Sequence, residues 1–138
     1  MGFNIKTVCV DRFKVNVWDV GGQKSIRSFW RNYFDTTDGL VWVVDSSDGH
    51  RLSDCRSELH SILREERLAG ASLLVLANKQ DVSGALKPEE VASILGIPDL
   101  RGSRHCVVVG CSAMDKESVT DSIHWIIHDI GDRIYTLR

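Results

Sequence analysis

The chain has 138 residues, and its 17 lysines and arginines against 19 aspartates and glutamates give a formal net charge of −2 at pH 7. A chain of this length forms a single domain, 1–138, with a core that needs no disulfide or metal. The near-neutral charge lacks the basic surface that nucleic acid or an anionic membrane requires. The apolar runs are too short to span a bilayer. We therefore expect neither a nucleic-acid partner nor a membrane span.

The cysteines are scattered along the chain without any CxxC pair: Cys9, Cys55, Cys106 and Cys111. A chain of this size needs no disulfides to hold its fold together. The sequence also carries no signal-peptide pattern. We therefore expect reduced thiols and a cytoplasmic location.

Residues 3–18 contain two runs of alternating apolar and polar residues around Asp11-Arg12, which predicts an antiparallel hairpin. A two-residue turn there would pair Val10 with Phe13 and Val8 with Val15. One face of the hairpin is predicted to lie against the core, and it carries Val8, Val10, Phe13, Val15 and Val17. The other face is predicted to lie outside the core, and it carries Phe3, Ile5 and Trp18 among polar residues.

Three later segments are continuous apolar runs, which is typical of parallel strands buried on both faces: Leu40–Val44, Leu73–Ala77 and Cys106–Val109. Apolar residues at spacings of three and four predict one helix from Leu52 to Leu63 and another from Val119 to Ile134. A shorter helix is predicted to begin near Pro88 and to end before Gly96.

This alternation of strands and helices predicts a doubly wound α/β sheet, mostly parallel with one antiparallel hairpin strand. Ligands of such sheets bind beyond the carboxyl ends of the strands. Three of these ends carry informative segments: Asp19-Val20-Gly21-Gly22-Gln23, Asn78-Lys79-Gln80-Asp81 and Cys111-Ser112-Ala113. Their order and spacing are those of a guanine-nucleotide-binding domain.

The side chains from Asn78 to Asp81 are suited to the recognition of guanine. The Asp81 carboxylate can accept from the ring N–H and the exocyclic amine of guanine, a pair of donors that adenine lacks. Asn78 can hold neighbouring loops and the base edge, and the stem of Lys79 can lie over the base. In the turn with Ser112, the Ala113 N–H can donate to the guanine oxygen. The alternative reading is a polar loop capped by Asn and Asp.

The segment after Trp18 fits the phosphate end of the same ligand. Asp19 can hold Mg²⁺ through its water shell, and Gly22 lets a backbone N–H approach a γ-phosphate. Gln23 can orient the attacking water. The alternative reading is a glycine turn that leaves a strand.

Several longer segments carry a family pattern: Gly2–Thr7, the WDVGGQ segment with Lys24–Phe34 after it, Gly39–Asp45 and Glu65–Asp81. They resemble the ADP-ribosylation-factor-like (Arf-like) small GTPases, over almost the whole chain and most strongly from Val17 to Asp81. Within that family, Lys24–Phe34 and Glu65–Ala71 most resemble the branch linked to tubulin-folding cofactor and to carriers of lipidated cargo.

The resemblance implies a GTP hydrolase that acts as a GTP/GDP switch with Mg²⁺. It divides the chain into an interswitch hairpin (1–18), switch II (19–36) and the remaining βα units with the guanine-specificity loops (37–138). It also implies exchange and activating proteins, and effectors that include tubulin-folding cofactor and lipid-binding cargo carriers. Three residues match the family's effector-binding aromatics, Phe3, Trp18 and Tyr33, with a set of core aromatics as the alternative.

The sequence contains no G-x-x-x-x-G-K-[ST] phosphate loop, so we expect an N-terminally incomplete domain that binds nucleotide weakly if at all. In the family pattern the first strand lies between the hairpin and the Leu40 strand. Without it, the neighbouring strands must either pair with each other or leave buried backbone groups unpaired, and we expect aggregation or partial unfolding. The alternative function is a truncated, nucleotide-free interaction module that uses the aromatic face.

The last predicted helix carries His124 and His128, four residues apart. Two such histidines can in principle bind a metal ion, but no third ligand accompanies them. Both lie off the apolar stripe, so a solvated helix face is the favoured interpretation.

Overall fold

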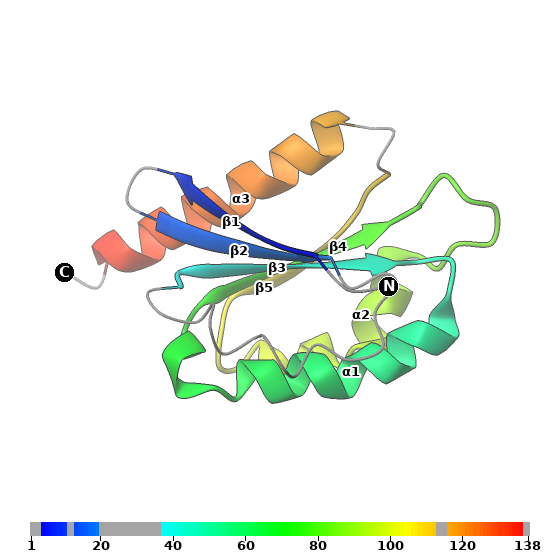
Figure 1. Cartoon of the computed structure of the whole chain (residues 1–138), viewed down its shortest axis with the longest axis horizontal. Helices are drawn as coiled ribbons and strands as arrows, with labels where there is room; N and C mark the ends of the chain where they lie inside the picture. The colour runs from blue at the N-terminus through cyan, green and yellow to red at the C-terminus, as the bar shows by residue number, and fades with distance from the viewer. Residues whose placement is uncertain (1–3, 11–12, 20–36, 113–115, 137–138) are drawn as a thin grey trace.

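The computed structural model of the chain describes residues 4–10, 13–19, 37–112 and 116–136. These residues form a five-stranded sheet whose spatial order is the order of the sequence (Figure 1). The strands are β1 (Asn4–Val10), β2 (Phe13–Asp19), β3 (Gly39–Asp45), β4 (Ser72–Asn78) and β5 (Cys106–Gly110). β1 runs antiparallel to β2, and β2 to β5 are parallel, as the sequence predicted.

The helices cover both faces of this sheet. They are α1 (Gly49–Leu63), α2 (Pro88–Ile94) and α3 (Lys116–Thr136), with short 3₁₀ turns at Glu66–Leu68 and Ile97–Leu100. Figure 1 shows α1 and α2 on one face and α3 on the other. Right-handed crossovers from β3 to β4 and from β4 to β5 move across the sheet in one direction, so their helices share a face. The predicted doubly wound α/β fold is confirmed.

The hairpin has the predicted register, with Val10 opposite Phe13 and Val8 opposite Val15. The turn at 11–12 lies outside the described residues.

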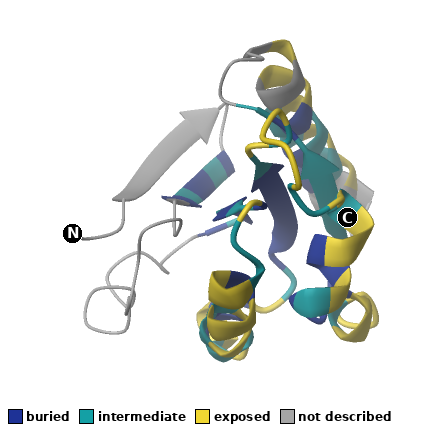
Figure 2. Ribbon diagram, turned by 90° about the vertical axis from the view of Figure 1, so that its right-hand side faces the viewer, coloured by how far each residue is buried: buried dark blue, intermediate teal, exposed yellow. Residues whose placement is uncertain are grey.

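Two apolar layers form the core, one on each side of the sheet. The layer under α1 and α2 contains Trp18, Leu40, Trp42, Leu52, Leu59, Leu73 and Val75 among others. The layer under α3 contains Phe13, Val15, Val41, Leu74, Leu76, Ile126 and Ile130. In Figure 2 the central strands are dark blue and the outer sides of the helices yellow. The prediction of burial on both faces is correct for β3 and β4 but wrong for β5, which is half-buried throughout because it is an edge strand.

The sheet is continuous between β2 and β3. Their parallel register runs from Val15 opposite Gly39 to Asp19 opposite Val43. From the sequence we expected that these two strands would either pair with each other or leave buried backbone groups unpaired. The structure shows that they pair. This pairing satisfies ladder groups that would otherwise be buried without partners. The expected tendency to aggregate stays a prediction.

Trp18 lies inside the core, so the prediction that it occupies a non-core face was wrong. Its side chain is 0% exposed and its ring stacks on that of Trp42, with 6.0 Å between ring centroids. The neighbouring Asn16 on the same face of β2 is also buried, and its amide donates to the Thr37 hydroxyl at 2.9 Å. The reason is that β2 pairs with β3, so the apolar layer under α1 and α2 extends over this face of β2.

Replacing Trp18 by Ala should therefore destabilise the fold strongly. Removing a large buried aromatic costs about 3 to 5 kcal/mol of unfolding free energy. Urea unfolding followed by far-ultraviolet circular dichroism measures this loss. Val82→Ala is the control, because Val82 is 41% exposed and should change stability little. A loss of less than about 1 kcal/mol for Trp18→Ala would place its side chain at the surface instead.

Candidate functional site

The carboxyl ends of β3, β4 and β5 meet at one edge of the sheet. Asp45 at the end of β3 lies opposite Asn78 at the end of β4, and Ala77 lies opposite Gly110 at the end of β5. The segments that follow these strands are therefore neighbours in space although they are far apart in the sequence. This is the edge at which the sequence predicted a nucleotide site.

Backbone hydrogen bonds join the loops at this edge into one unit. The Cys111 N–H donates to the Ala77 carbonyl and the Gln80 N–H to the Cys111 carbonyl, both at 3.0 Å. On the other side of β4, the Ser46 N–H donates to the Asn78 carbonyl at 3.1 Å. The loop that carries Asn78, Lys79 and Asp81 is thus held from both sides.

Asp81 and Ser112 lie together, as expected of two parts of one site. The Ser112 hydroxyl donates to Asp81 Oδ1 at 2.9 Å, and the two residues are 31 apart in the chain. Asp81 is exposed, so its carboxylate can accept further hydrogen bonds from a ligand. The sequence placed both residues in the site but did not reveal this bond.

Asn78 and Gln80 attach the loop to the rest of the edge. The buried Cys111 thiol donates to Asn78 Oδ1 at 3.9 Å, and the Gln80 amide donates to the Leu86 carbonyl at 2.9 Å. Asn78 therefore holds a neighbouring loop, which is one of its two predicted roles. Gly110 is needed where β5 leaves the sheet, because a Cβ there would lie 2.9 Å from Pro88 Cγ.

Lys79 has a left-handed backbone, with φ 65°, and among the described residues it is the one non-glycine with positive φ. Its Nζ lies 3.0 Å from Oδ2 of Asp45. Oδ1 of Asp45 accepts from the backbone N–H of Ser47 at 2.9 Å and also from the Ser47 hydroxyl. Asp45 was not identified from the sequence as a residue of the site. Its position as an acidic residue at the carboxyl end of a buried strand could have indicated it.

The Asp45 carboxylate is stabilised in its charged form. Burial by itself would raise its pKa, but the donors from Ser47 and the ammonium of Lys79 outweigh burial and lower the pKa below the usual 3.8. The carboxylate is therefore ionised at neutral pH and pairs with a cation.

The predicted phosphate end lies largely outside the described residues. Gly22 and Gln23 are in the segment 20–36, and Ala113 follows the last described residue of its loop. Asp19 ends β2 at the correct edge of the sheet, but its side chain is not among those described. Phe3 and Tyr33 of the predicted effector face also lie outside. Trp18 is buried in the core, so its side chain is not available on the predicted effector-binding face.

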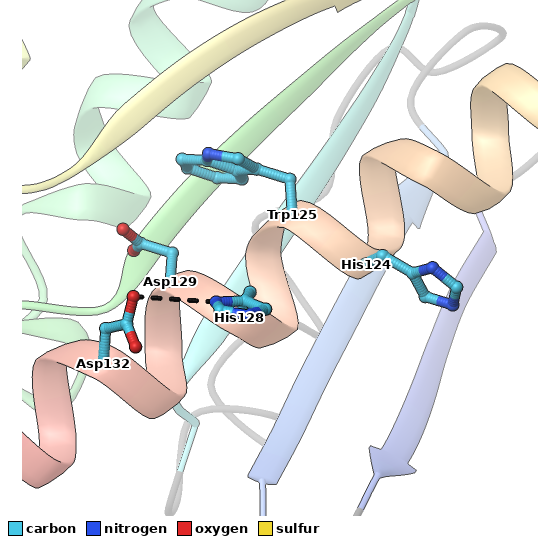
Figure 3. Close-up of a pocket in the computed structure, with 5 residues that line it drawn as sticks. All are labelled: His124, Trp125, His128, Asp129 and Asp132. Atoms are coloured by element: carbon cyan, nitrogen blue, oxygen red, sulfur yellow. Dashed lines mark ion pairs between the residues drawn. The ribbon is translucent and has the colours of Figure 1, made fainter.

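The second candidate site, His124 and His128, lies on the outer face of α3. A pocket of about 350 Å³ there is lined by His124, Trp125, His128, Asp129 and Asp132 (Figure 3). His128 Nδ1 lies 3.6 Å from Asp132 Oδ2, whereas His124 points away from them. No group of three or more His, Cys, Asp or Glu side chains in the described part of the chain is placed to hold a metal ion. Both histidines are exposed, as the solvated-face interpretation requires.

The chain is similar to a family of known proteins over most of its length. Residues 1–130 match the model of the ADP-ribosylation factor family. The chain belongs to this family. Its members are small GTPases that bind and hydrolyse GTP, generally with Mg²⁺, and work with regulators and effectors. Among the residues that the structure describes, none of the helices has the length and apolar character of a membrane span.

Individual relatives support the same membership. The chain is 57% identical over 137 residues to ADP-ribosylation factor-like protein 2 of Arabidopsis thaliana and 56% identical to that of Drosophila melanogaster. Each match covers 99% of this chain and 74% of the relative. A solved structure of the Arl6 BBS3 small GTPase from Trypanosoma brucei, with the bound nucleotide analogue GppNp, is 31% identical. It has a TM-score of 0.75, and the match covers 95% of this chain and 80% of that one.

The lowered pKa of Asp45 predicts an acid-dependent contribution to stability. A carboxylate with a depressed pKa in the folded state stabilises the fold fully above its unfolded pKa and loses this effect as pH falls through the folded value. Asp45→Asn should therefore lower the unfolding free energy more at pH 6 than at pH 3, as measured by urea unfolding. Asp54→Asn on the exposed face of α1 is the matched charge control. An equal loss at both pH values for Asp45→Asn would contradict the prediction.

Proposed function

We propose that the loops at the carboxyl ends of β3, β4 and β5 bind the guanine base and that the chain is an Arf-type GTP/GDP switch. The observation that carries the proposal is the hydrogen bond of 2.9 Å between Ser112 and Asp81, which holds two predicted base-binding segments together at the carboxyl edge of the sheet. The family membership supports the GTP-binding switch as the activity that this edge serves.

Each residue of the edge has a distinct role in this proposal. Asp81 accepts from the ring N–H and the exocyclic amine of guanine, while Ser112 keeps its carboxylate in place. The stem of Lys79 lies over the base, and Asn78 holds the loop of Cys111. The backbone N–H of Ala113 donates to the guanine oxygen and rejects the amine of adenine.

The phosphate end of the proposed site is formed by Asp19, Gly22 and Gln23. Asp19 would hold Mg²⁺ through water, and Mg²⁺ supplies charge neutralisation at the β- and γ-phosphates. The backbone of Gly22 approaches the γ-phosphate, and Gln23 orients the attacking water. These roles follow from the family resemblance of the Asp19–Gln23 segment.

We also propose that the chain acts in the cytoplasm and in the branch's pathways, with tubulin-folding cofactor and lipid-binding cargo carriers as effectors. The relatives named ADP-ribosylation factor-like protein 2 support the choice of branch. Phe3 and Tyr33 remain the proposed effector-binding aromatics. With the family's first strand, phosphate-binding loop and first helix joined ahead of Met1, the GTP-loaded protein should bind purified tubulin-folding cofactor more tightly than the GDP-loaded protein does. Equal binding of both forms would remove this partner from the proposal.

Replacing Asp81 by Asn should weaken guanine binding and favour xanthine, because the amide offers a donor where xanthine has a carbonyl. Once the base covers Asp81, loss of this acceptor contact costs about 1 to 3 kcal/mol, or roughly 5- to 150-fold in affinity. Nuclear magnetic resonance titration of the 138-residue chain with millimolar GMP, XMP and AMP detects even weak base binding.

The control is Asp99→Asn, which removes the same charge from a side chain that is 78% exposed in the segment leading to β5. It should leave the base preference unchanged. An unchanged preference for GMP in Asp81→Asn would remove Asp81 from base recognition, and equal binding of GMP and AMP by the original chain would refute the proposed function.

For hydrolysis, Gln23→Leu should slow GTP turnover by at least about tenfold, equivalent to about 1.4 kcal/mol of barrier, because the amide that orients the water is lost. The measurement is a single-turnover rate, made on the chain with the family's first strand, phosphate-binding loop and first helix joined ahead of Met1. The affinity for GDP should change little. Equal rates for both proteins would assign the role to another residue.

A further inference from the structure

The ion pair between Asp45 and Lys79 joins the end of β3 to the loop after β4, where the proposed base site lies.

 Asp45 is the last residue of β3 and lies opposite Asn78 in the register of β4, so Lys79 is the first residue beyond the paired edge. The left-handed backbone of Lys79 accompanies a side chain whose Nζ is 3.0 Å from Asp45 Oδ2. A lysine in this region of φ is uncommon and marks a position that its surroundings hold in place.

Asp45 is the fixed member of this pair. Its side chain is 19% exposed, against 52% for Lys79. Both donors of Ser47 hold its other oxygen, so the carboxylate has little freedom to turn. The ammonium of Lys79 ends a flexible four-carbon stem, and the ion pair with Asp45 holds that ammonium in place.

We propose that Asp45 is a positioning residue for guanine: it anchors the ammonium of Lys79 so that the lysine stem is ordered before the base arrives. The inference rests on the proposed function and adds to it a residue that does not itself touch the base. A stem that is already ordered loses less conformational entropy when a planar base packs on it. The free energy of base binding is therefore more favourable. Without Asp45 the stem samples other rotamers, and base binding must order it.

The test is a double-mutant cycle on the 138-residue chain, titrated with GMP by nuclear magnetic resonance. The variants are Asp45→Asn, Lys79→Met and the two combined, since Met keeps an unbranched stem without the charge. Asp45→Asn should weaken GMP binding by about threefold or more, as expected for one side chain that loses its preorganisation. In the Lys79→Met background the same change should have no effect, because there is no ammonium to anchor.

The matched control is Asp48→Asn, three residues along the same loop. Asp48 caps α1 by accepting from the Arg51 N–H at 3.2 Å, and Asn serves as well at such a position. This variant removes the same charge and should bind GMP as the original chain does. Amide spectra of each variant, recorded without ligand, report whether the fold is retained.

Three results would overturn the assignment. Unchanged GMP affinity in Asp45→Asn would show that the anchor is not used. An equal loss with and without the Lys79 ammonium would make Asp45 a structural residue of the β3–β4 edge. Equal binding of GMP and AMP by the original chain would refute the proposed function and this inference together, whereas the first two results leave the proposed function standing.

Discussion

The parallel hydrogen-bond ladder of β3, β4 and β5 is the constraint on which the site depends. Parallel strands end at the same edge, so Asp45, Asn78 and Gly110 are brought together although helices separate them in the sequence. The loops beyond these ends then bond to one another through their backbones. Any ligand of this edge meets a surface whose polar groups are already held in place, which lowers the cost of binding.

Burial on both sides of the sheet has consequences that reach beyond the core. β2 pairs with β3, and helices cover the two faces, so Trp18 and Asn16 are enclosed on a face that alternation alone marks as polar. The stack of Trp18 on Trp42 adds aromatic contact area under α1 and α2. The carboxyl half of the hairpin therefore belongs to the core, and Trp18 is a packing residue in this arrangement.

Electrostatics at the site edge follow from the same geometry. The Asp45 carboxylate is partly removed from water, but Ser47 and Lys79 supply enough donors to keep it charged. Asp81 is exposed and is held by a neutral hydroxyl donor from Ser112. One carboxylate therefore has a lysine as its partner, while the other remains accessible to donors of a ligand.

The sequence by itself determined the elements, the hairpin register and the loops of the base site. These features depend on short-range patterns, such as the alternation around Val8 and Val15 or the polar residues that follow an apolar run at Asn78. It also predicted that Asp81 and Ser112 share a site, because the carboxyl ends of parallel strands share an edge.

Only the tertiary structure decided which faces are covered and which side chains meet. The burial of Trp18 depends on β3 lying beside β2, and the partial exposure of β5 depends on its place at the edge. The pair of Asp45 with Lys79 joins residues 34 apart in the chain. No local period encodes such contacts, because they arise when strands far apart in the sequence come into register and bring their side chains within bonding distance.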